Sequence, residues 1–181
     1  MGHTIETDRL LLQPLNQSHF DFMLELEAIT ESYEYDRDTP LSPDEVKEGC
    51  HWFIEKVKSL PKEGAIRWIV IYNGASIGEV HVNCISETNS EWEIGWHFLP
   101  ECWGKGFATE AAAAIIKYAF TYFKIHRIIA MCCTENLRSV ALAERVGMQK
   151  DGRMRENKLL RGKYYDEYVL SILKREIKTS V

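Results

Sequence analysis

The chain has 181 residues, of which 45% are apolar and 27% charged, with a formal net charge of −5. This composition excludes an intrinsically disordered chain, which combines low hydrophobicity with high net charge. No apolar run approaches the roughly 20 residues of a membrane-spanning helix, and Met1–Glu6 lacks the pattern of a signal peptide. The five cysteines form no C-x-x-C pair, which argues against disulfides or a zinc ribbon and favours a cytoplasmic protein. We expect one domain over residues 1–181.

Charge is distributed unevenly along the chain. Residues 1–99 contain 7 Lys and Arg against 18 Asp and Glu, whereas residues 100–181 contain 15 against 9. This asymmetry suggests a site that takes a cationic ligand on one side and an anionic ligand on the other, although scattered surface charge gives the same counts. Acidic residues dilute the basic ones throughout, so nucleic acid is a poor candidate partner.

The first 60 residues predict a strand followed by two helices. Arg9–Leu15 is the strand, ending at Pro14, and Ser18 caps a helix whose apolar residues fall at helical spacing. Ser42–Glu45 is a capping box with proline at the first helical position, and it opens a second helix that runs to about Leu60. An acidic and aromatic connector lies between the two helices.

Three antiparallel strands are predicted next, over residues 66–72, 76–85 and 91–98, and the Asn73-Gly74 pair between the first two is a strong hairpin signal. A long helix, a buried strand, a short helix capped by Asn136 and a last hairpin complete the chain. Their ranges are 109–123, 127–133, 137–146, 148–155 and 164–172. This order predicts a mixed α/β (α+β) domain with one parallel strand–helix–strand unit within residues 91–133.

Two short motif matches do not fit their predicted surroundings. Gly74–Gly78 matches the G-x-S-x-G nucleophile elbow, but Ser76 lies between a hairpin turn and a strand, whereas the elbow needs a strand and then a helix. Gly104-Lys105-Gly106 matches neither the Walker loop nor the dinucleotide fingerprint, whose third glycine is Thr109 here. A simple phosphate-holding loop before a helix remains.

Six segments occur in an order that is more specific than any one of them. They are Thr7–Leu12, Glu93–Trp96, Trp103–Ala111, Asn136-x-x-Ser139, Glu144–Met148 and Gly162–Asp166. The ordered set resembles the GCN5-related N-acetyltransferases (GNAT), and within them the ribosomal-protein alanine/serine N-acetyltransferases. This resemblance covers nearly the whole chain. It implies the GNAT fold, a mostly antiparallel mixed sheet with a central splayed parallel strand pair and about four helices.

The resemblance implies that acetyl-CoA is the cosubstrate. The family pattern Q/R-x-x-G-x-G/A falls on Trp103, Gly106 and Ala108, and departs from the pattern at Trp103. Small residues at a helix start let backbone N–H groups approach a pyrophosphate, aided by the partial positive charge of the helix. The residues predicted to bind the cofactor are Trp96, Phe98, Trp103, Gly104, Lys105, Gly106, Phe107, Ala108, Thr109 and Asn136.

The resemblance also implies two catalytic groups and no metal. Ser139 is predicted to donate a proton to the departing thiolate, because Ala143 occupies the place where many relatives carry a tyrosine. Glu93 is the first candidate for general base, since the strand before the cofactor loop often supplies one. Two other positions stay open. They are the segment around Glu156 and Lys158, where some relatives carry a glutamate, and His81, for which a structural role is the alternative.

The connector Tyr33–Asp38 is expected to form the wall of the acceptor site, and its acids suit a cationic acceptor. An α-amine titrates near ~8 and a lysine near ~10.4, so an α-amine needs less help from a base. We therefore expect an amine acceptor such as a ribosomal or other protein N-terminus. A small-molecule amine acceptor and a non-catalytic acyl-CoA-binding module remain alternatives. We expect no membrane partner, and the last hairpin or a sheet edge offers a surface for a homodimer.

Overall fold

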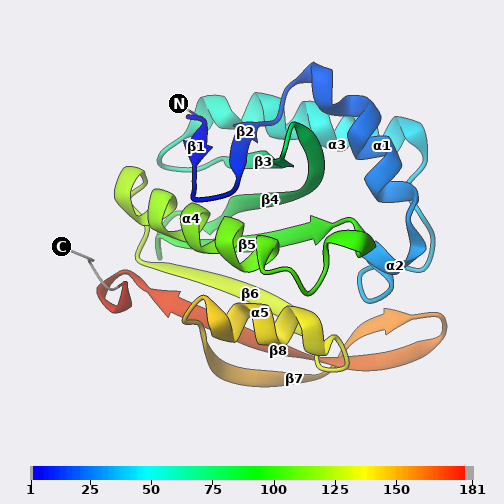
Figure 1. Ribbon diagram of the computed structural model, residues 1–181. Coiled ribbons are helices and arrows are strands. Elements are labelled where there is room, and N and C mark those ends of the chain that lie inside the picture. The colour runs from blue at the N-terminus through cyan, green and yellow to red at the C-terminus, as the bar shows by residue number, and fades with distance from the viewer. Residues whose placement is uncertain (1, 178–181) are drawn as a thin grey trace.

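The computed structural model describes residues 2–177, and within them one sheet has the strand order β1-β2-β3-β4-β5-β6-β8-β7 (Figure 1). The strands are β1 Ile5–Glu6, β2 Leu11–Pro14, β3 Ala65–Tyr72, β4 Ala75–Ser86, β5 Glu91–Phe98, β6 Arg127–Cys133, β7 Gln149–Leu160 and β8 Lys163–Leu173. Strands β5 and β6 are parallel and the other neighbouring pairs are antiparallel. The predicted fold class is confirmed.

Strands β5 and β6 pair only at their beginnings, from Glu91 opposite Arg127 to Glu93 opposite Ile129. Beyond Glu93 the two strands diverge, while β5 stays paired with β4 as far as Phe98. This divergence leaves one edge of β5 without a strand partner in the middle of the sheet (Figure 1). The predicted splayed parallel pair is therefore present.

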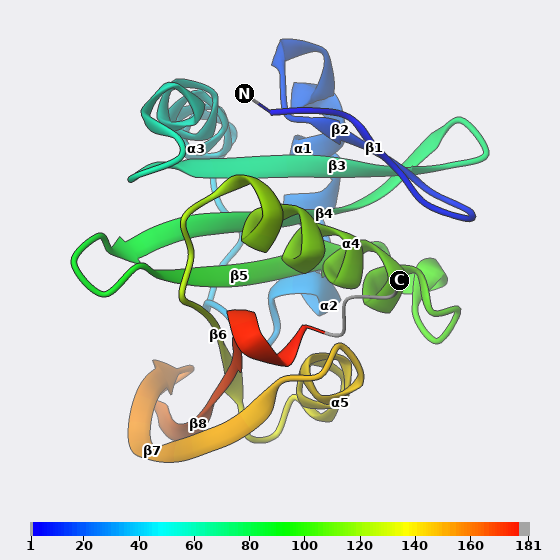
Figure 2. The ribbon, with the colours of Figure 1, turned by 90° about the vertical axis from the view of Figure 1, so that its left-hand side faces the viewer.

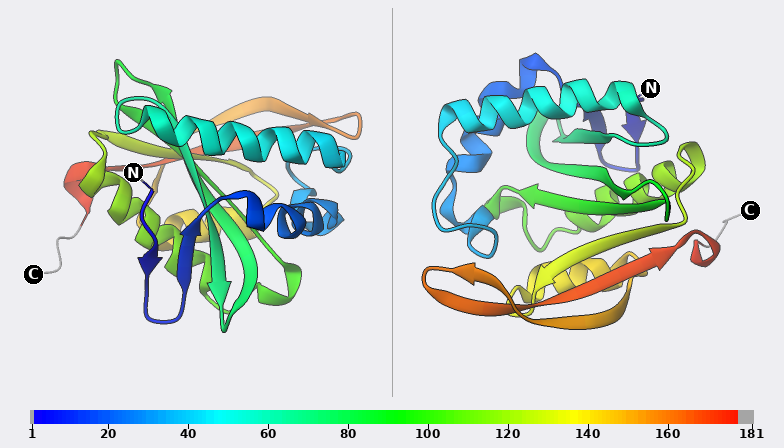
Figure 3. Two further views of the ribbon diagram at one scale, coloured as in Figure 1. Left: turned by 90° about the horizontal axis from the view of Figure 1, so that it is seen from above. Right: turned by 180° about the vertical axis from the view of Figure 1, so that it is seen from behind.

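Four longer helices cover the two faces of the sheet (Figures 2 and 3). The helices α1 Phe20–Ala28 and α3 Pro43–Lys56 pack over one face, and α4 Phe107–Tyr122 and α5 Leu137–Arg145 pack over the other. Both faces need a cover because successive side chains of a strand point to opposite faces. In β3, Ile66 and Trp68 enter the core on the α4 side, and Ala65 and Ile69 enter the core on the α3 side. None of the helices in residues 2–177 is long and apolar enough to cross a membrane.

Short helical segments occupy several connections. They are the single turn α2 Thr30–Tyr33, which leads into the connector, and the 3₁₀ turns Gln17–His19, Val57–Ser59, Pro100–Cys102 and Lys174–Glu176. The prediction that Ser18 caps the first helix is wrong. Asn16 caps the 3₁₀ turn Gln17–His19 that leads directly into α1, and its Oδ1 accepts the Ser18 backbone N–H at 2.9 Å. The N-cap residue of α1 itself is His19, which makes no side-chain cap bond.

The predicted first strand is present as β2, and a short strand that was not predicted, Ile5–Glu6, pairs with it through a turn. The Thr7 backbone N–H donates to the Leu10 carbonyl at 2.9 Å, and the Leu10 N–H donates to Thr7 Oγ1 at 3.0 Å. These bonds fold Ile5–Glu6 back onto Leu11–Pro14. The long helix begins at Phe107 rather than Thr109, because Gly106 takes a left-handed conformation (φ 81°) as its N-cap.

The turn between β1 and β2 is fastened to the start of α4. Thr7 Oγ1 donates to Glu110 Oε1 at 2.6 Å, and Arg9 Nε donates to Glu110 Oε2 at 2.7 Å. Arg9 Nη1 also donates to the Lys105 carbonyl at 3.1 Å. The N-terminal motif thus holds the loop that precedes α4, although it lies about a hundred residues away in the chain.

Candidate active site

A cleft of about 820 Å³, here called the loop cleft, opens between the end of β5, the loop into α4 and the helix α5. Nine of the ten residues predicted to bind a cofactor line it. The exception is Lys105, whose carbonyl accepts the bond from Arg9. Gly104 and Gly106 in this loop have φ values of 73° and 81°, which few residues other than glycine adopt.

The loop cleft has the features of an anion site. The N-terminus of α4 opens onto it, where backbone N–H groups and the helix dipole favour negative charge. Arg138 and Arg145, from α5, also line it. The sequence offered no means to choose these two arginines among 22 basic residues, because only the packing of α5 beside the loop brings them there.

Trp103 connects the two walls of the loop cleft. Its Nε1–H donates to the Phe98 carbonyl at 2.9 Å. The Arg138 guanidinium carbon lies 3.8 Å from the centroid of the Trp103 ring, a close cation–π contact. The side chain that replaces Gln or Arg of the family pattern thus supports an arginine supplied by another helix.

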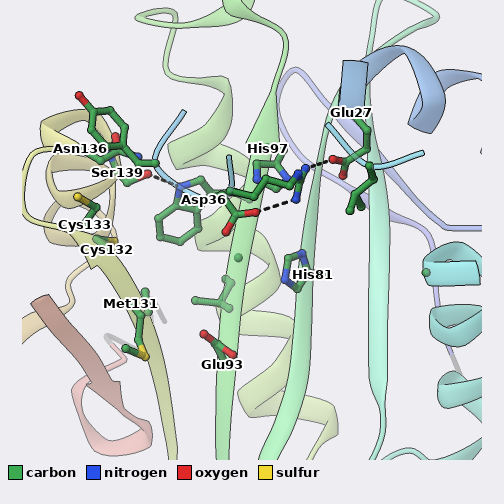
Figure 4. Close-up of a pocket in the computed structure, with 18 of the residues that line it drawn as sticks. Glu27, Asp36, His81, Glu93, His97, Met131, Cys132, Cys133, Asn136 and Ser139 are labelled. Atoms are coloured by element: carbon green, nitrogen blue, oxygen red, sulfur yellow. Dashed lines mark hydrogen bonds and ion pairs between the residues drawn. The ribbon is translucent and has the colours of Figure 1, made fainter. Parts of the chain in front are cut away.

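A second cavity of about 360 Å³, here called the sheet cavity, lies against β3, β4 and β5 beneath the connector (Figure 4). Carboxylates and cations both line it. They are Glu27, Asp36, Glu45, Glu93 and Glu167 together with Arg37, Arg67, His81, His97 and Lys158.

The two cavities meet at the point where β5 leaves β6. Five residues line both of them: Tyr35, Trp96, His97, Asn136 and Ser139. The Trp96 indole N–H donates to Ser139 Oγ at 3.3 Å, and the Ser139 backbone N–H donates to Asn136 Oδ1 at 3.2 Å, as the predicted helix cap requires. The geometry therefore brings Ser139 between a large anion-binding cleft and a smaller polar cavity.

Glu79 forms a buried ionic cluster in β4, under the sheet cavity. Its carboxylate has no exposed surface and lies 3.2 Å from Arg67 Nε, 3.1 Å from His81 Nδ1 and 3.4 Å from His97 Nδ1. Burial opposes its ionisation, but the charges of Arg67 and His81 outweigh that cost and hold the Glu79 pKa well below its usual range. Conversely, burial lowers the pKa of His97, and its hydrogen bond and attraction to Glu79 more than compensate and raise it.

Sequence reasoning missed this cluster, including His97. One signal was present: Glu79 and His81 are two residues apart in a strand and so share a face of the sheet. The contributions of Arg67 and His97 depend on strand register, which pairs Arg67 with His81 and Glu79 with His97 across the sheet.

The candidate bases predicted from the sequence lie in different places. Glu93 lines the sheet cavity but not the loop cleft. Glu156 is exposed on β7 and lines neither cavity. Lys158 lines the sheet cavity, with its Nζ 3.2 Å from Asp36 Oδ1 and 3.8 Å from Glu167 Oε1.

The connector does form one wall of the sheet cavity, through Tyr35, Asp36 and Arg37. It is tied to the tip of the β7–β8 hairpin by Arg161, whose backbone N–H donates to Asp38 Oδ1 at 2.7 Å and whose Nη2 donates to the Glu34 carbonyl at 2.8 Å. Burial of Asp36 is outweighed by Lys158, His97 and Arg37, so its pKa is lowered.

Comparison with known proteins identifies this arrangement. A family model described as an acetyltransferase (GNAT) domain matches residues 9–149. The chain belongs to the GNAT family. The uncharacterized N-acetyltransferase p20 of Bacillus licheniformis is 32% identical over 176 residues, covering 96% of this chain and 97% of p20. YdaF of Bacillus subtilis, provisionally named a ribosomal N-acetyltransferase, is 31% identical over 107 residues, covering 59% of this chain and 58% of YdaF.

Solved acetyltransferases share the fold. The spermidine N-acetyltransferase of Vibrio cholerae, crystallised with CoA and spermine, superposes with a TM-score of 0.82 at 24% identity, covering 94% of this chain and 98% of that one. This GNAT protein is thus an N-acetyltransferase, and acetyl-CoA is its cosubstrate. The loop cleft fits that molecule: the α4 N-terminus and two arginines suit its phosphates, and the unpaired edge of β5 offers backbone groups for its pantetheine arm.

Proposed function

We propose that this acetyltransferase moves an acetyl group directly onto the α-amine at the N-terminus of a protein or peptide. The observation that carries the proposal is the meeting of the loop cleft and the sheet cavity at Ser139. An acyl donor in the loop cleft and an amine in the sheet cavity reach each other there, through the gap between β5 and β6. Such juxtaposition converts a bimolecular reaction into an effectively unimolecular one.

The charges of the sheet cavity support an acceptor with a single ammonium group. Glu27 and Asp36 are paired with Arg37, Glu167 with Lys158 and Asn157, and Glu45 with Ser42. Glu93 is the cavity carboxylate that has no side-chain partner within residues 2–177. One free carboxylate matches one incoming cation, whereas a polyamine brings several. We therefore assign Glu93 to holding the ammonium group of the acceptor.

An α-amine also suits the modest basicity available. It titrates near ~8, so a substantial fraction is already neutral at pH 7 to 8, whereas a lysine side chain near ~10.4 is almost entirely protonated. The cavity is bounded by the connector and by Lys158 of β7, and Arg161 bonds the connector to the hairpin tip. An extended chain end reaches a cavity enclosed in this way more readily than a side chain in the middle of a folded surface.

Two residues that line both cavities, Trp96 and Ser139, supply the remaining chemistry. When bound, acetyl-CoA supplies an activated acetyl thioester. Because the Ser139 hydroxyl accepts the Trp96 N–H, its own proton stays available for the sulfur that departs. The free edge of β5 at Trp96 offers backbone donors for the carbonyl oxygen, a kind of stabilisation typically worth about 3 kcal/mol of barrier.

A covalent route through cysteine is disfavoured. Burial raises the pKa of the Cys132 thiol to about 12, and burial also raises the pKa of Cys102 above its usual value. Thiolate is the nucleophilic form of cysteine, so neither residue is activated at neutral pH. Direct transfer between the two bound substrates is the simpler route.

The experiment is an acceptor panel measured by release of free CoA. The panel contains a peptide with a free N-terminal serine or alanine, the same peptide N-acetylated but carrying a lysine, and spermidine. We expect turnover with the first alone, and we expect Glu93→Gln to raise the KM for the peptide more than it lowers kcat. Preference for spermidine or for the lysine would refute the α-amine proposal.

A binding control separates failure of the acceptor assignment from failure of the protein as an enzyme. Acetyl-CoA at about 100 times its Kd should stabilise the fold by roughly 2.7 kcal/mol, which is a melting shift of about 5–10 °C at this size, with NAD and ATP as comparison ligands. A shift with acetyl-CoA and no turnover on the panel would point to a non-catalytic acyl-CoA-binding module.

A further inference from the structure

We infer that His97, held in place by the buried carboxylate of Glu79, accepts the proton that the acceptor amine loses during acetyl transfer. This assigns to His97 the base role that sequence reasoning gave to Glu93. The inference rests on transfer to an amine, which membership of the family supplies, and does not depend on that amine being a protein N-terminus.

The position of His97 is the first argument. It lines both the loop cleft and the sheet cavity, whereas Glu93 lines the sheet cavity alone. His97 also follows Trp96 directly in β5, and successive side chains of a strand point to opposite faces. Trp96 reaches Ser139 on the α5 side, so His97 presents its ring on the opposite face of β5, in the sheet cavity that the proposed function gives to the acceptor (Figure 4).

The second argument is how the ring is held. His97 Nδ1 lies 3.4 Å from Glu79 Oε1, and the Glu79 side chain is fully buried. No hydrogen bond to His97 Nε2 is found within residues 2–177. A carboxylate that fixes one ring nitrogen orients the imidazole, determines its tautomer and leaves the other nitrogen for proton transfer.

His81 provides an internal comparison. It binds the same carboxylate through Nδ1 at 3.1 Å, but its ring lies against the backbone of Gly95. A Cβ atom on Gly95 would come within 2.5 Å of His81 Cε1 and 2.6 Å of Nε2. His81 lines the sheet cavity and not the loop cleft. We therefore assign His81 to structural support of Glu79.

The surrounding charges tune His97 for this role. Acidic groups face it from three elements: Glu79 of β4, Glu27 of α1 and Asp36 of the connector. Cations accompany each acid, with Arg67 beside Glu79, Arg37 beside Glu27 and Asp36, and Lys158 beside Asp36. The acids prevail and raise the pKa of His97, so its neutral, proton-accepting form grows as pH rises above ~6.5.

In the transfer step both the leaving sulfur and the released proton have a partner. The amine nitrogen uses its lone pair to form the bond to the acetyl carbon, and the carbon–sulfur bond breaks with its electron pair going to sulfur. His97 Nε2 takes the proton released from nitrogen, and the Ser139 hydroxyl gives a proton to sulfur. Proton exchange with solvent restores both side chains, so one amide and one thiol are produced from one amine and one thioester.

The test is the pH dependence of kcat/KM for the best acceptor of the panel, in wild type and in five variants. His97→Gln should lower kcat at least 100-fold at pH 7.5 and abolish the rise of activity above pH 6.5. His97→Ala should regain activity when imidazole is added. The matched variant His81→Gln, which removes the other histidine on Glu79, should keep the rise of kcat/KM above pH 6.5, here called the rising limb. Glu93→Gln should also keep it while raising the acceptor KM.

Glu79→Gln addresses the orienting role. We expect the rising limb to move to lower pH in this variant, because the group that raises the His97 pKa is neutralised. Every variant is checked for the melting shift with acetyl-CoA, which reports an intact loop cleft. A His97→Gln enzyme that shows this shift and keeps the wild-type pH profile would overturn the inference, as would loss of the limb in Glu93→Gln alone.

Discussion

The indole N–H of Trp96 donates to Ser139 Oγ at 3.3 Å, across the gap that opens between β5 and the segment after β6. Trp96 lies three residues beyond Glu93, the last residue of β5 that pairs with β6, and Ser139 lies in the first turn of α5, positioned by the Asn136 cap. The bond thus joins two elements that the backbone leaves apart at this point. In this bond the Ser139 hydroxyl oxygen is the acceptor, so the hydroxyl proton is free to be donated elsewhere.

Replacing Ser139 with alanine should therefore lower kcat about 100-fold, the lower end of what a general acid contributes. The KM for acetyl-CoA should change little, because the loop that we expect to bind its phosphates is untouched. Trp96→Phe, which keeps a ring and removes the N–H, should lower kcat by a smaller factor. Steady-state kinetics of CoA release measure both variants, and wild-type kcat in Ser139→Ala would remove Ser139 from the mechanism.

Arg138→Ala should weaken CoA binding about tenfold, or about 1.4 kcal/mol, because the guanidinium stacked on Trp103 faces the anion site. Calorimetry with CoA and with pantetheine tests this. The loss should appear with CoA and be absent with pantetheine, which carries no pyrophosphate. Equal losses for the two ligands would show that Arg138 acts only by packing against Trp103. Trp103→Leu should reproduce part of the effect.

Gly95→Ala should destabilise the fold by about 1–3 kcal/mol, a cost typical of overpacking, since the added Cβ would lie 2.5 Å from the His81 ring. Urea unfolding measures the change. Gly49→Ala is the matched control, because nothing lies within 4 Å of its built Cβ in the middle of α3. That control should be neutral or stabilising by up to about 1 kcal/mol. Equal effects at the two sites would contradict the close packing of His81.

The cluster around Glu79 predicts a pH window for stability. The pKa of Glu79 is lowered, so the stability it contributes is fully present above its ordinary value near ~4.3 and is lost as pH falls below that. The pKa of His97 is raised, so the stability it contributes is fully present below ~6.5 and is lost as pH rises through the raised value. Between these limits the contribution of the cluster should be greatest.

Glu79→Gln should remove this pH dependence and cost about 3–5 kcal/mol, because Arg67 would stay buried without its partner. Thermal unfolding at pH 4, 5.5 and 8 measures both effects. A variant with the wild-type profile would show that other groups determine the acid and alkaline limits of stability.

The elements and their order were predictable because each has a local cause. The strand Arg127–Cys133 was predicted with its observed bounds, the Asn73-Gly74 turn marked its hairpin, and Asn136 caps its helix as expected. Errors occurred where two local signals compete. Asn16 and Ser18 are both good cap residues, and only the observed bond decides between them. The Thr7 hydroxyl accepts the Leu10 N–H in the turn that folds Ile5–Glu6 back onto the predicted strand, a hairpin that periodicity alone does not show.

The sequence by itself determined the family and nine of the residues that line the loop cleft, since the signals for a glycine-rich loop and a helix start are local. Only the tertiary structure decided which side chains meet around the two cavities. Arg138 meets Trp103 because α5 packs beside the loop, and His97 meets Glu79 because β4 and β5 pair in one register. A shift of one residue in that register would turn each side chain to the other face of the sheet. Such contacts depend on packing between distant segments, and no local pattern records them.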